Sequence, residues 1–193
     1  GLILHLSAST DMGDTNNSKV LVATVSEALK MGADAVSMHI NLGAETEPEM
    51  LRDLGNLSRE CEEWGMPLLV MAYPRGPKIK NSYQPEHVAH GARVATELGA
   101  DIVKCSYTGD IDSFREIVRG TLAPVVIAGG PKMASDHDML TMVRDSLEAG
   151  GRGVSIGRNI FQHKDVEGIT RAISDIVLRG ATVEEAMKNI KKF

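Results

Sequence analysis

Short apolar runs alternate with longer amphipathic stretches along the whole chain. The runs are rich in Val, Ile and Leu, and their starts lie 23 to 34 residues apart. In the stretch after each run, apolar residues recur at the spacing of a helix. Strands that alternate with helices in this way form βαβ units. We therefore expect a parallel sheet with strands at 2–7, 34–40, 67–73, 101–107, 124–130 and 153–159.

Helix boundaries are marked by residues that start or stop helices. Gly32, Gly65 and Gly99 each follow an amphipathic stretch, where glycine commonly ends a helix. Asp110 and Asp136 precede such stretches, and we expect them to act as N-caps. The segment 183–193 predicts a final amphipathic helix.

Two architectures fit six βα units: an open doubly wound sheet and part of a (β/α)8 barrel. The first run leads into LSASTDMGD, which lacks the GxGxxG pattern of dinucleotide-binding sheets. Glycines that can hold phosphate instead follow the last two runs, in AGGPK and SIGRN. Barrels commonly bind phosphate after strands seven and eight. We therefore expect residues 1–193 to form a single parallel (β/α)8 barrel domain that contains strands three to eight and lacks the first two.

Composition excludes several classes of function. The chain has 193 residues, a formal net charge of −5 and few aromatic side chains, which disfavours nucleic-acid binding. Its apolar runs are far shorter than the ~20 residues that cross a bilayer, so we expect no membrane association. Two cysteines, Cys61 and Cys105, indicate a reducing cytoplasm rather than a disulfide scaffold. No Cys/His/Asp cluster has zinc spacing, and we expect neither metal nor cofactor.

Lys104 is the strongest candidate for catalysis. It lies within the apolar run IVKCSY, where its ammonium is poorly solvated. Burial lowers the pKa of a lysine, and the free amine can then attack a carbonyl to form a Schiff base. A lysine at a strand end that pairs with an acid is the alternative interpretation.

Tyr73 is the second candidate, because it ends the run PLLVMAY. A phenol at the carboxyl end of a barrel strand can transfer a proton, especially where an ammonium lowers its pKa. A tyrosine that merely packs at the rim is the alternative. His5 and His39 lie on the first two runs, as either substrate contacts or structural histidines.

The glycines after the last two runs form a candidate phosphate site. Gly129, Gly130 and Gly157 can bring backbone N–H groups against an anion, and Arg158 adds a guanidinium. Lys132 lies close to the first pair. The alternative is that these glycines serve only as turns between strand and helix.

Four segments, YPRG, VKCSYTGD, VIAGGPK and GVSIGRNIFQ, resemble the archaeal-type class I aldolase family, and the similarity extends through essentially all 193 residues. That family contains fructose-bisphosphate aldolases and 2-amino-3,7-dideoxy-D-threo-hept-6-ulosonate synthases. The resemblance implies a TIM barrel with a Schiff-base lysine on strand six. It assigns the lysine to Lys104, the proton donor to Tyr73, phosphate contacts to Gly129, Gly130, Gly157 and Arg158, and further substrate contacts to Pro74 and Arg75. It also implies two preceding strands with an Asp-His-Gly motif.

Within this family, HINLGAETEPEMLRDLG and LLVMAYPRG resemble the synthase branch. Met71 stands where the aldolases tend to carry Trp. The resemblance implies a phosphorylated keto-sugar donor, L-aspartate semialdehyde as the acceptor aldehyde, and a role in aromatic amino acid biosynthesis. It also implies a homo-oligomer of five or ten subunits.

Other functions stay open at this point. Fructose-bisphosphate aldolase is the alternative within the family. A non-catalytic barrel fragment and a sugar-phosphate barrel enzyme without a Schiff base are alternatives of other classes. Trapping with borohydride separates them, because only a Schiff-base enzyme becomes fixed to a keto substrate.

Overall fold

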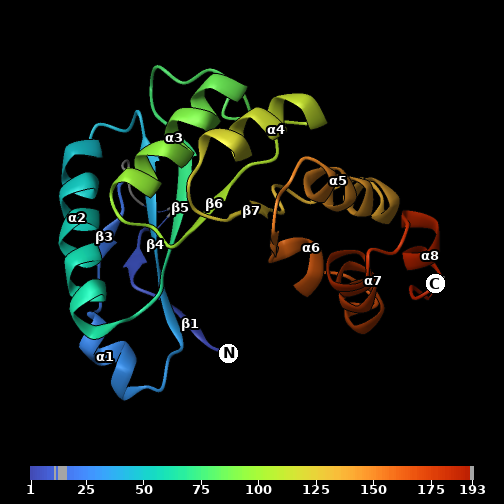
Figure 1. Ribbon diagram of the computed structural model, residues 1–193, viewed down its shortest axis with the longest axis horizontal. Helices are drawn as coiled ribbons and strands as arrows, with labels where there is room; N and C mark the ends of the chain where they lie inside the picture. The colour runs from blue at the N-terminus through green and yellow to red at the C-terminus, as the bar shows by residue number, and fades with distance from the viewer. Residues whose placement is uncertain (11, 13–16, 192–193) are drawn as a thin grey trace.

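A curved parallel sheet forms the centre of the molecule. The computed structural model describes residues 1–10, 12 and 17–191. Within this part of the chain the strand order in the main sheet is β1-β4-β5-β6-β7-β8, all pairs being parallel (Figure 1). The elements are β1 Ile3–His5, β2 Ser7–Ala8, β3 Val20–Leu21, α1 Val25–Lys30, β4 Ala35–Leu42, α2 Glu47–Trp64, β5 Leu68–Pro74, α3 Pro85–Glu97, β6 Ile102–Cys105, α4 Ile111–Gly120, β7 Val125–Ala128, α5 Asp136–Glu148, β8 Gly153–Ser155, α6 Arg158–Phe161, α7 Val166–Arg179 and α8 Val183–Met187.

The order of the strands decides between the two architectures. Each strand of the main sheet pairs with the next one of that sheet in the sequence, without the reversal that marks a doubly wound sheet, in the part of the chain described. The sheet curls, and the long helices cover its outer face (Figure 1). This arrangement is a partial (β/α)8 barrel, as the alternation of runs predicts.

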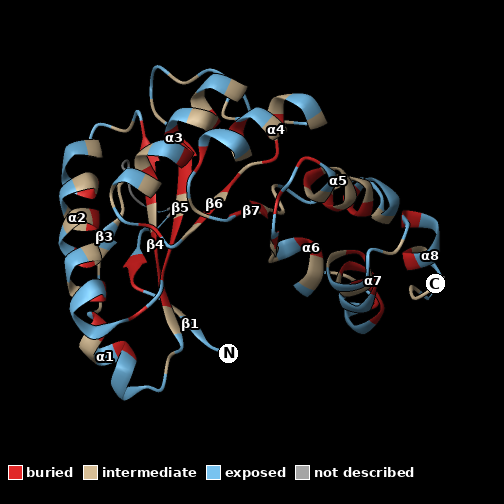
Figure 2. Ribbon diagram, viewed as in Figure 1, coloured by how far each residue is buried: buried red, intermediate tan, exposed pale blue. Residues whose placement is uncertain are grey.

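The hydrophobic core lies between the outer face of the sheet and the helices. Val70 and Val103 are completely buried, whereas the residues that follow them, Met71 and Lys104, are only partly buried. Figure 2 shows that buried residues are concentrated in the sheet. A Cβ atom on Gly91 of α3 would lie only 2.9 Å from Leu42 Cδ1 and 3.7 Å from Ala72 Cβ. The missing side chain therefore lets α3 pack closely on β4 and β5. Residues of opposite parity face the concave side of the sheet.

Four strands are shorter than the sequence predicts. Those expected at 2–7, 101–107, 124–130 and 153–159 are observed at 3–5, 102–105, 125–128 and 153–155. Ser7 pairs instead with Leu21 in the separate β2–β3 ladder. The backbone turns at Gly130, whose φ is +64° and which therefore cannot continue a strand. Beyond β8, Gly157 is the N-cap of the short helix α6, so Arg158 begins a helix rather than ending a strand.

The helix boundaries confirm most of the expected caps. Gly65 ends α2 in the left-handed conformation, and the Asp110 carboxylate accepts the Ser113 N–H at 2.8 Å. The expectation for Asp136 is wrong, because Ser135 is the N-cap of α5 and accepts the Asp138 N–H at 3.1 Å. A serine hydroxyl one residue earlier reaches the N3 position and leaves Asp136 in the first helical turn.

Two features at the ends of the chain differ from the prediction. The expected helix at 183–193 is helical only at Val183–Met187, and its last residues, 192–193, lie outside the described residues. Near the other end, β2 and β3 form a short antiparallel pair that the hydrophobic pattern does not reveal. Two-residue strands are too short for a period-two pattern to stand out.

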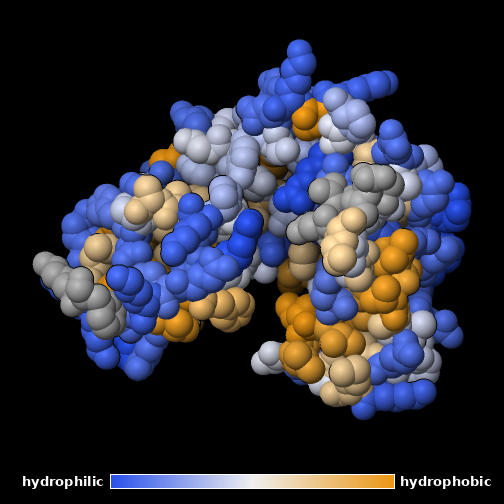
Figure 3. Space-filling view, turned by 180° about the vertical axis from the view of Figure 1, so that it is seen from behind, coloured by the Kyte–Doolittle hydropathy of each residue, from blue (hydrophilic) through white to orange (hydrophobic). Residues whose placement is uncertain are grey.

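Exposed apolar side chains gather near the start of the chain. Leu2, Ile3, Val20 and Val22 all lie at the surface. Viewed from behind, the molecule has a notch with hydrophobic side chains along one wall (Figure 3). In the described residues, no helix combines the length and the apolar character needed to span a membrane.

Candidate active site

Lys104 lies on the concave face of the sheet. It alternates on β6 with the fully buried Val103 and Cys105, which pack on the helix side. Partial burial lowers the pKa of its ammonium, and among the described residues its Nζ has neither an ion-pair nor a hydrogen-bond partner. An amine that is desolvated but not paired with an acid is suited to nucleophilic attack on a carbonyl.

Tyr73 lies on the neighbouring strand and shares this face. Met71 is the register partner of Lys104, and Tyr73 follows Met71 by two positions on β5. Tyr73 is buried, its ring meets the His39 ring edge-on at 5.0 Å, and Arg75 Cζ lies 4.8 Å from the ring centre. The two candidate groups therefore face the same space.

The pKa of Tyr73 is raised, whereas the sequence analysis expected a neighbouring ammonium to lower it. Burial raises the pKa of the phenol, and the nearby Arg75 charge only partly opposes this effect. A cation does lie beside the ring, but desolvation outweighs it. The phenol therefore carries its proton at neutral pH.

A polar network extends from β1 to β4 on the same side as these groups. His5 Nδ1 lies 3.0 Å from Ser37 Oγ, and its Nε2 lies 3.3 Å from Ser7 Oγ. The Ser7 hydroxyl in turn accepts the backbone N–H of His39 at 3.0 Å. Burial, followed by the positive charge of Lys104, lowers the pKa of His5. The histidine and the lysine therefore belong to one electrostatic environment.

His39 is held neutral within this network. Its Nε2 donates to Asn41 Oδ1 at 2.8 Å, and the Asn41 amide donates to the Asn17 carbonyl at 2.7 Å. Burial lowers the pKa of His39 to about 3, and the charges of Lys19 and Arg75 act in the same direction. Sequence reasoning left His5 and His39 undecided, because Ser37, which contacts the His5 ring, and Asn17, which holds the Asn41 partner of His39, come from other segments of the chain.

The candidate phosphate loops lie together at the carboxyl ends of β7 and β8. The Arg158 guanidinium donates to the Gly130 carbonyl at 3.1 Å, which joins the two loops. A Cβ atom on Gly129 would lie 2.6 Å from Ile156 Cγ2, so this position needs glycine for close packing. Gly157, at the N-cap of α6, belongs to the same loop as Arg158.

Asn159 is a residue of this region that the sequence analysis missed. Its buried amide donates to the carbonyls of Gly129 at 2.8 Å and Pro131 at 3.1 Å, and its oxygen accepts the Met133 N–H at 2.9 Å. The Asn159 side chain, which follows β8, therefore holds the loop that follows β7 in its conformation. An asparagine beside a glycine-arginine pair is the sequence signal that could have found it.

The remaining predicted site residues stand at the end of β5. Pro74 is the last residue of the strand, and the Arg75 N–H donates to the Leu42 carbonyl at 2.8 Å. Pro74, Arg75 and Tyr73 therefore lie at the same end of the sheet as the two glycine loops. All eight predicted site residues come from strands β5 to β8 or from the segments that follow them.

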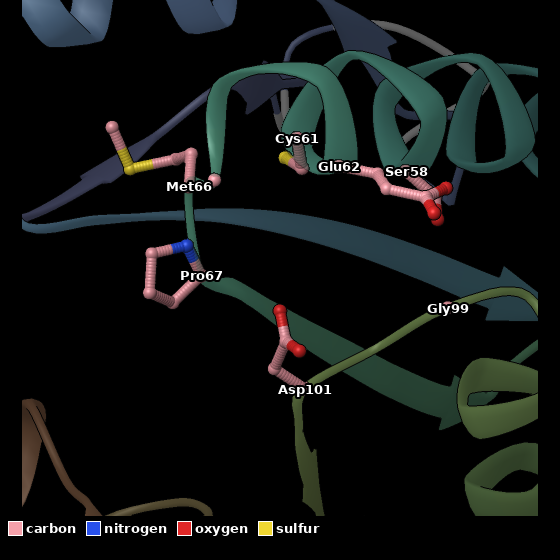
Figure 4. Close-up of a pocket in the computed structure, with 8 residues that line it drawn as sticks. Ser58, Cys61, Glu62, Met66, Pro67, Gly99 and Asp101 are labelled. Carbon is pink, nitrogen blue, oxygen red and sulfur yellow. The ribbon is translucent and has the colours of Figure 1, made fainter.

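A pocket at the opposite end of the sheet is separate from these groups. It encloses about 640 Å³ and is lined by Ser58, Cys61, Glu62, Gly65, Met66, Pro67, Gly99 and Asp101 (Figure 4). Pro67 and Asp101 immediately precede β5 and β6, so this pocket lies at the amino ends of the strands. In the described part of the chain, no group of three or more His, Cys, Asp or Glu side chains could hold a metal ion.

Comparison with known proteins identifies the family. The profile of the DeoC/LacD family aldolases matches residues 1–163, and the chain belongs to this family. A 2-amino-4,5-dihydroxy-6-oxo-7-(phosphonooxy)heptanoate synthase of Streptomyces griseus is 44% identical over 181 residues, which cover 94% of this chain and 66% of that protein. A 2-amino-3,7-dideoxy-D-threo-hept-6-ulosonate synthase of Halobacterium salinarum is 41% identical over 187 residues, covering 97% of this chain and 70% of that one.

A solved structure is similar in fold as well as in sequence. An archaeal fructose-1,6-bisphosphate aldolase, with its catalytic lysine covalently bound to the carbinolamine intermediate of the substrate, superposes with a TM-score of 0.88. It is 38% identical, and the similarity covers 91% of this chain and 70% of that chain. The present chain thus spans about two thirds of the length of the relatives that it matches.

Proposed function

We propose that this protein is a class I aldolase-type synthase that forms a Schiff base between Lys104 and a phosphorylated keto sugar. The observation that carries the proposal is the position of Lys104: a partly buried amine on the concave face of β6, next to the strand that bears Tyr73. The covalently bound lysine in the similar archaeal aldolase supports the same chemistry.

The proposed reaction begins with attack of the Lys104 amine on the substrate carbonyl. The carbinolamine loses water and becomes an iminium ion. Cleavage of the adjacent carbon–carbon bond sends its electron pair into the iminium, which becomes an enamine. The hydroxyl on the departing carbon loses its proton to a base, and that carbon leaves as the aldehyde. The enamine then adds to a second aldehyde, whose oxygen takes a proton, and water releases Lys104 from the product.

Tyr73 is the proposed proton donor in the addition step. Burial keeps its phenol protonated, so it can donate to the aldehyde oxygen as the new carbon–carbon bond forms. The backbone at Gly129, Gly130 and Gly157, together with Arg158, is the proposed phosphate site, and Pro74 and Arg75 are proposed further contacts with the substrate. Charge-assisted hydrogen bonds at such a site would fix the carbonyl in front of Lys104.

The names of the two synthase relatives favour the synthase branch over the aldolase. Both names describe seven-carbon 2-amino keto acids. We propose 2-amino-3,7-dideoxy-D-threo-hept-6-ulosonate synthesis, with L-aspartate semialdehyde as acceptor, in aromatic amino acid biosynthesis. Fructose-bisphosphate cleavage is the second candidate, which the similar archaeal structure favours. We also propose a homo-oligomer of five or ten subunits, which sedimentation equilibrium would test.

Reductive trapping tests the proposal. The protein, expressed from its own gene, is incubated with a phosphorylated keto sugar and sodium borohydride and then analysed by peptide mass spectrometry. The expected adduct is on Lys104. Supplying L-aspartate semialdehyde should yield a seven-carbon amino keto acid, whereas release of triose phosphates from fructose bisphosphate alone would identify the aldolase. Absence of any lysine adduct with active protein would refute the Schiff-base chemistry.

A further inference from the structure

Tyr83 lies beside the candidate phosphate loop, although no sequence pattern singles it out. A Cβ atom on Gly130 would lie 3.5 Å from the Tyr83 hydroxyl oxygen. The turn at Gly130 has a φ of +64°, so glycine is favoured there on backbone grounds as well. The phenol thus reaches, from the segment between β5 and α3, to the loop that follows β7.

The backbone holds Tyr83 in place without using its hydroxyl. Its N–H donates to Asn81 Oδ1 at 2.9 Å, and α3 begins two residues later at Pro85. The side chain is 42% exposed, and in the described residues no group forms a hydrogen bond with its Oη. A tyrosine with a fixed backbone, a half-exposed ring and an unused hydroxyl is available to a ligand.

Tyr83 also influences the Tyr73 phenol. Together with Cys105 it raises the pKa of that phenol, although burial and the opposing Arg75 charge have larger effects. The Tyr83 hydroxyl adjoins the proposed phosphate loop. A keto-sugar phosphate bound at Lys104 would extend to that loop.

The charges around Tyr83 indicate on which side an anion would lie. Tyr83 lines an open pocket of about 410 Å³ together with Asp138 and Asp145. These two carboxylates disfavour an anion inside that pocket. At the Gly130 turn, Arg158 supplies a positive charge instead.

We propose that the Tyr83 hydroxyl donates a hydrogen bond to the phosphate group of the substrate, which makes Tyr83 a further substrate-binding residue. This inference rests on the proposed function, because it needs a phosphate at Gly130. It also explains why a large aromatic side chain is kept half-exposed at this position.

The test compares two variants that each lose one phenol hydroxyl. Tyr83→Phe keeps the ring, and Tyr107→Phe is the matched control, because Tyr107 lines the same pocket and its buried hydroxyl has no partner among the described residues. For Tyr83→Phe we expect Kd for inorganic phosphate and KM for the phosphorylated keto sugar to rise about tenfold, as for the loss of one hydrogen bond to a charged group. Borohydride trapping of an unphosphorylated ketone should not change. Tyr107→Phe should leave all three quantities unchanged.

The outcomes separate this inference from the proposed function. Unchanged phosphate binding in Tyr83→Phe, or equal weakening for phosphorylated and unphosphorylated ketones, would overturn the role of Tyr83. Because calorimetry with inorganic phosphate needs no turnover, it reports on Tyr83 even where trapping fails. Phosphate binding that depends on Tyr83 without any Lys104 adduct would refute the Schiff-base function and leave the phosphate contact standing.

Discussion

Met71 on β5 pairs directly with Lys104 on β6. Register partners on parallel strands project to the same face, and neighbouring strands lie ~4.8 Å apart. Tyr73 follows Met71 by two residues, so it lies on the same face of the sheet as Lys104 and closer to the carboxyl end of the strands. Two groups that act on one carbonyl carbon and its neighbours need such a placement. Met71, which stands where the aldolases tend to carry Trp, is thus the residue next to the proposed nucleophile.

Replacing Lys104 should abolish activity without lowering the stability of the protein. Lys104→Ala and Lys104→Arg should both abolish trapping and turnover, since a guanidinium does not deprotonate to attack a carbonyl. Lys104→Met should also raise the melting temperature at pH 7, because the lowered pKa of Lys104 means that burying its ammonium costs free energy. Calorimetry and borohydride trapping measure the two effects. A Lys104→Ala protein that still traps substrate would exclude the assignment, and Lys132 would be tested next.

The pH dependence of trapping should reflect the environment of Lys104. Because burial lowers the pKa of its ammonium below the ordinary value of 10.5, the free amine is already present at lower pH. The rate of adduct formation should rise with pH and reach half its maximum below pH 10.5. A midpoint at or above that value would mean that the reacting lysine is fully solvated.

Tyr73→Phe should keep Schiff-base formation and slow the later proton transfer. The ring remains packed against His39, so the fold is retained, but the proton donor is lost. We expect trapping in normal yield and turnover reduced by about 10²–10⁴, the usual contribution of general acid–base catalysis. Single-turnover kinetics with a borohydride quench resolves the two steps. Normal turnover would assign the proton transfer to another group.

Arg158 and Asn159 are adjacent, but their loss should have different consequences. Arg158→Ala removes an exposed side chain and should raise KM for a phosphorylated sugar much more than for an unphosphorylated one, with little change in stability. Asn159→Ala removes a buried amide and leaves the Gly129 carbonyl and the Met133 N–H, both partly buried, without this partner, so it should lower the free energy of unfolding by about 1–3 kcal/mol. Urea unfolding and steady-state kinetics distinguish the two variants. Equal effects of Arg158→Ala on both sugars would make Arg158 purely structural.

Acid should destabilise the protein through His39. Its pKa is about 3 in the folded chain and near the ordinary 6.5 when unfolded, so the unfolded state binds more protons between these values. Stability should therefore fall as the pH drops from about 6.5 toward about 3. His39→Gln, which lacks a titrating group, should lose less stability between pH 7 and pH 4.5 than the unaltered protein. His90→Gln, an exposed position on α3, is the control and should behave like the unaltered protein.

Much of the architecture could be predicted from local patterns. The apolar runs placed all six strands of the main sheet, and the missing GxGxxG, with glycines after the last two runs, favoured a barrel over a doubly wound sheet. These features depend on residues close together in the sequence: periodicity, turn residues and helix caps. Lys104 and Tyr73 stood out for the same reason, as polar groups within apolar runs.

The tertiary structure decided the matters that depend on distant residues. Ser135, not Asp136, is the N-cap of α5. The turn at Gly130 and the helix N-cap at Gly157 lie where the apolar pattern predicts that strands continue. The Tyr73 phenol has a raised pKa despite the cation beside it, because burial is a property of the whole fold and outweighs one neighbouring charge. Hydrogen bonds of His5, His39 and Asn159 join segments that only the closing of the sheet brings together, and no local pattern in the chain encodes such contacts.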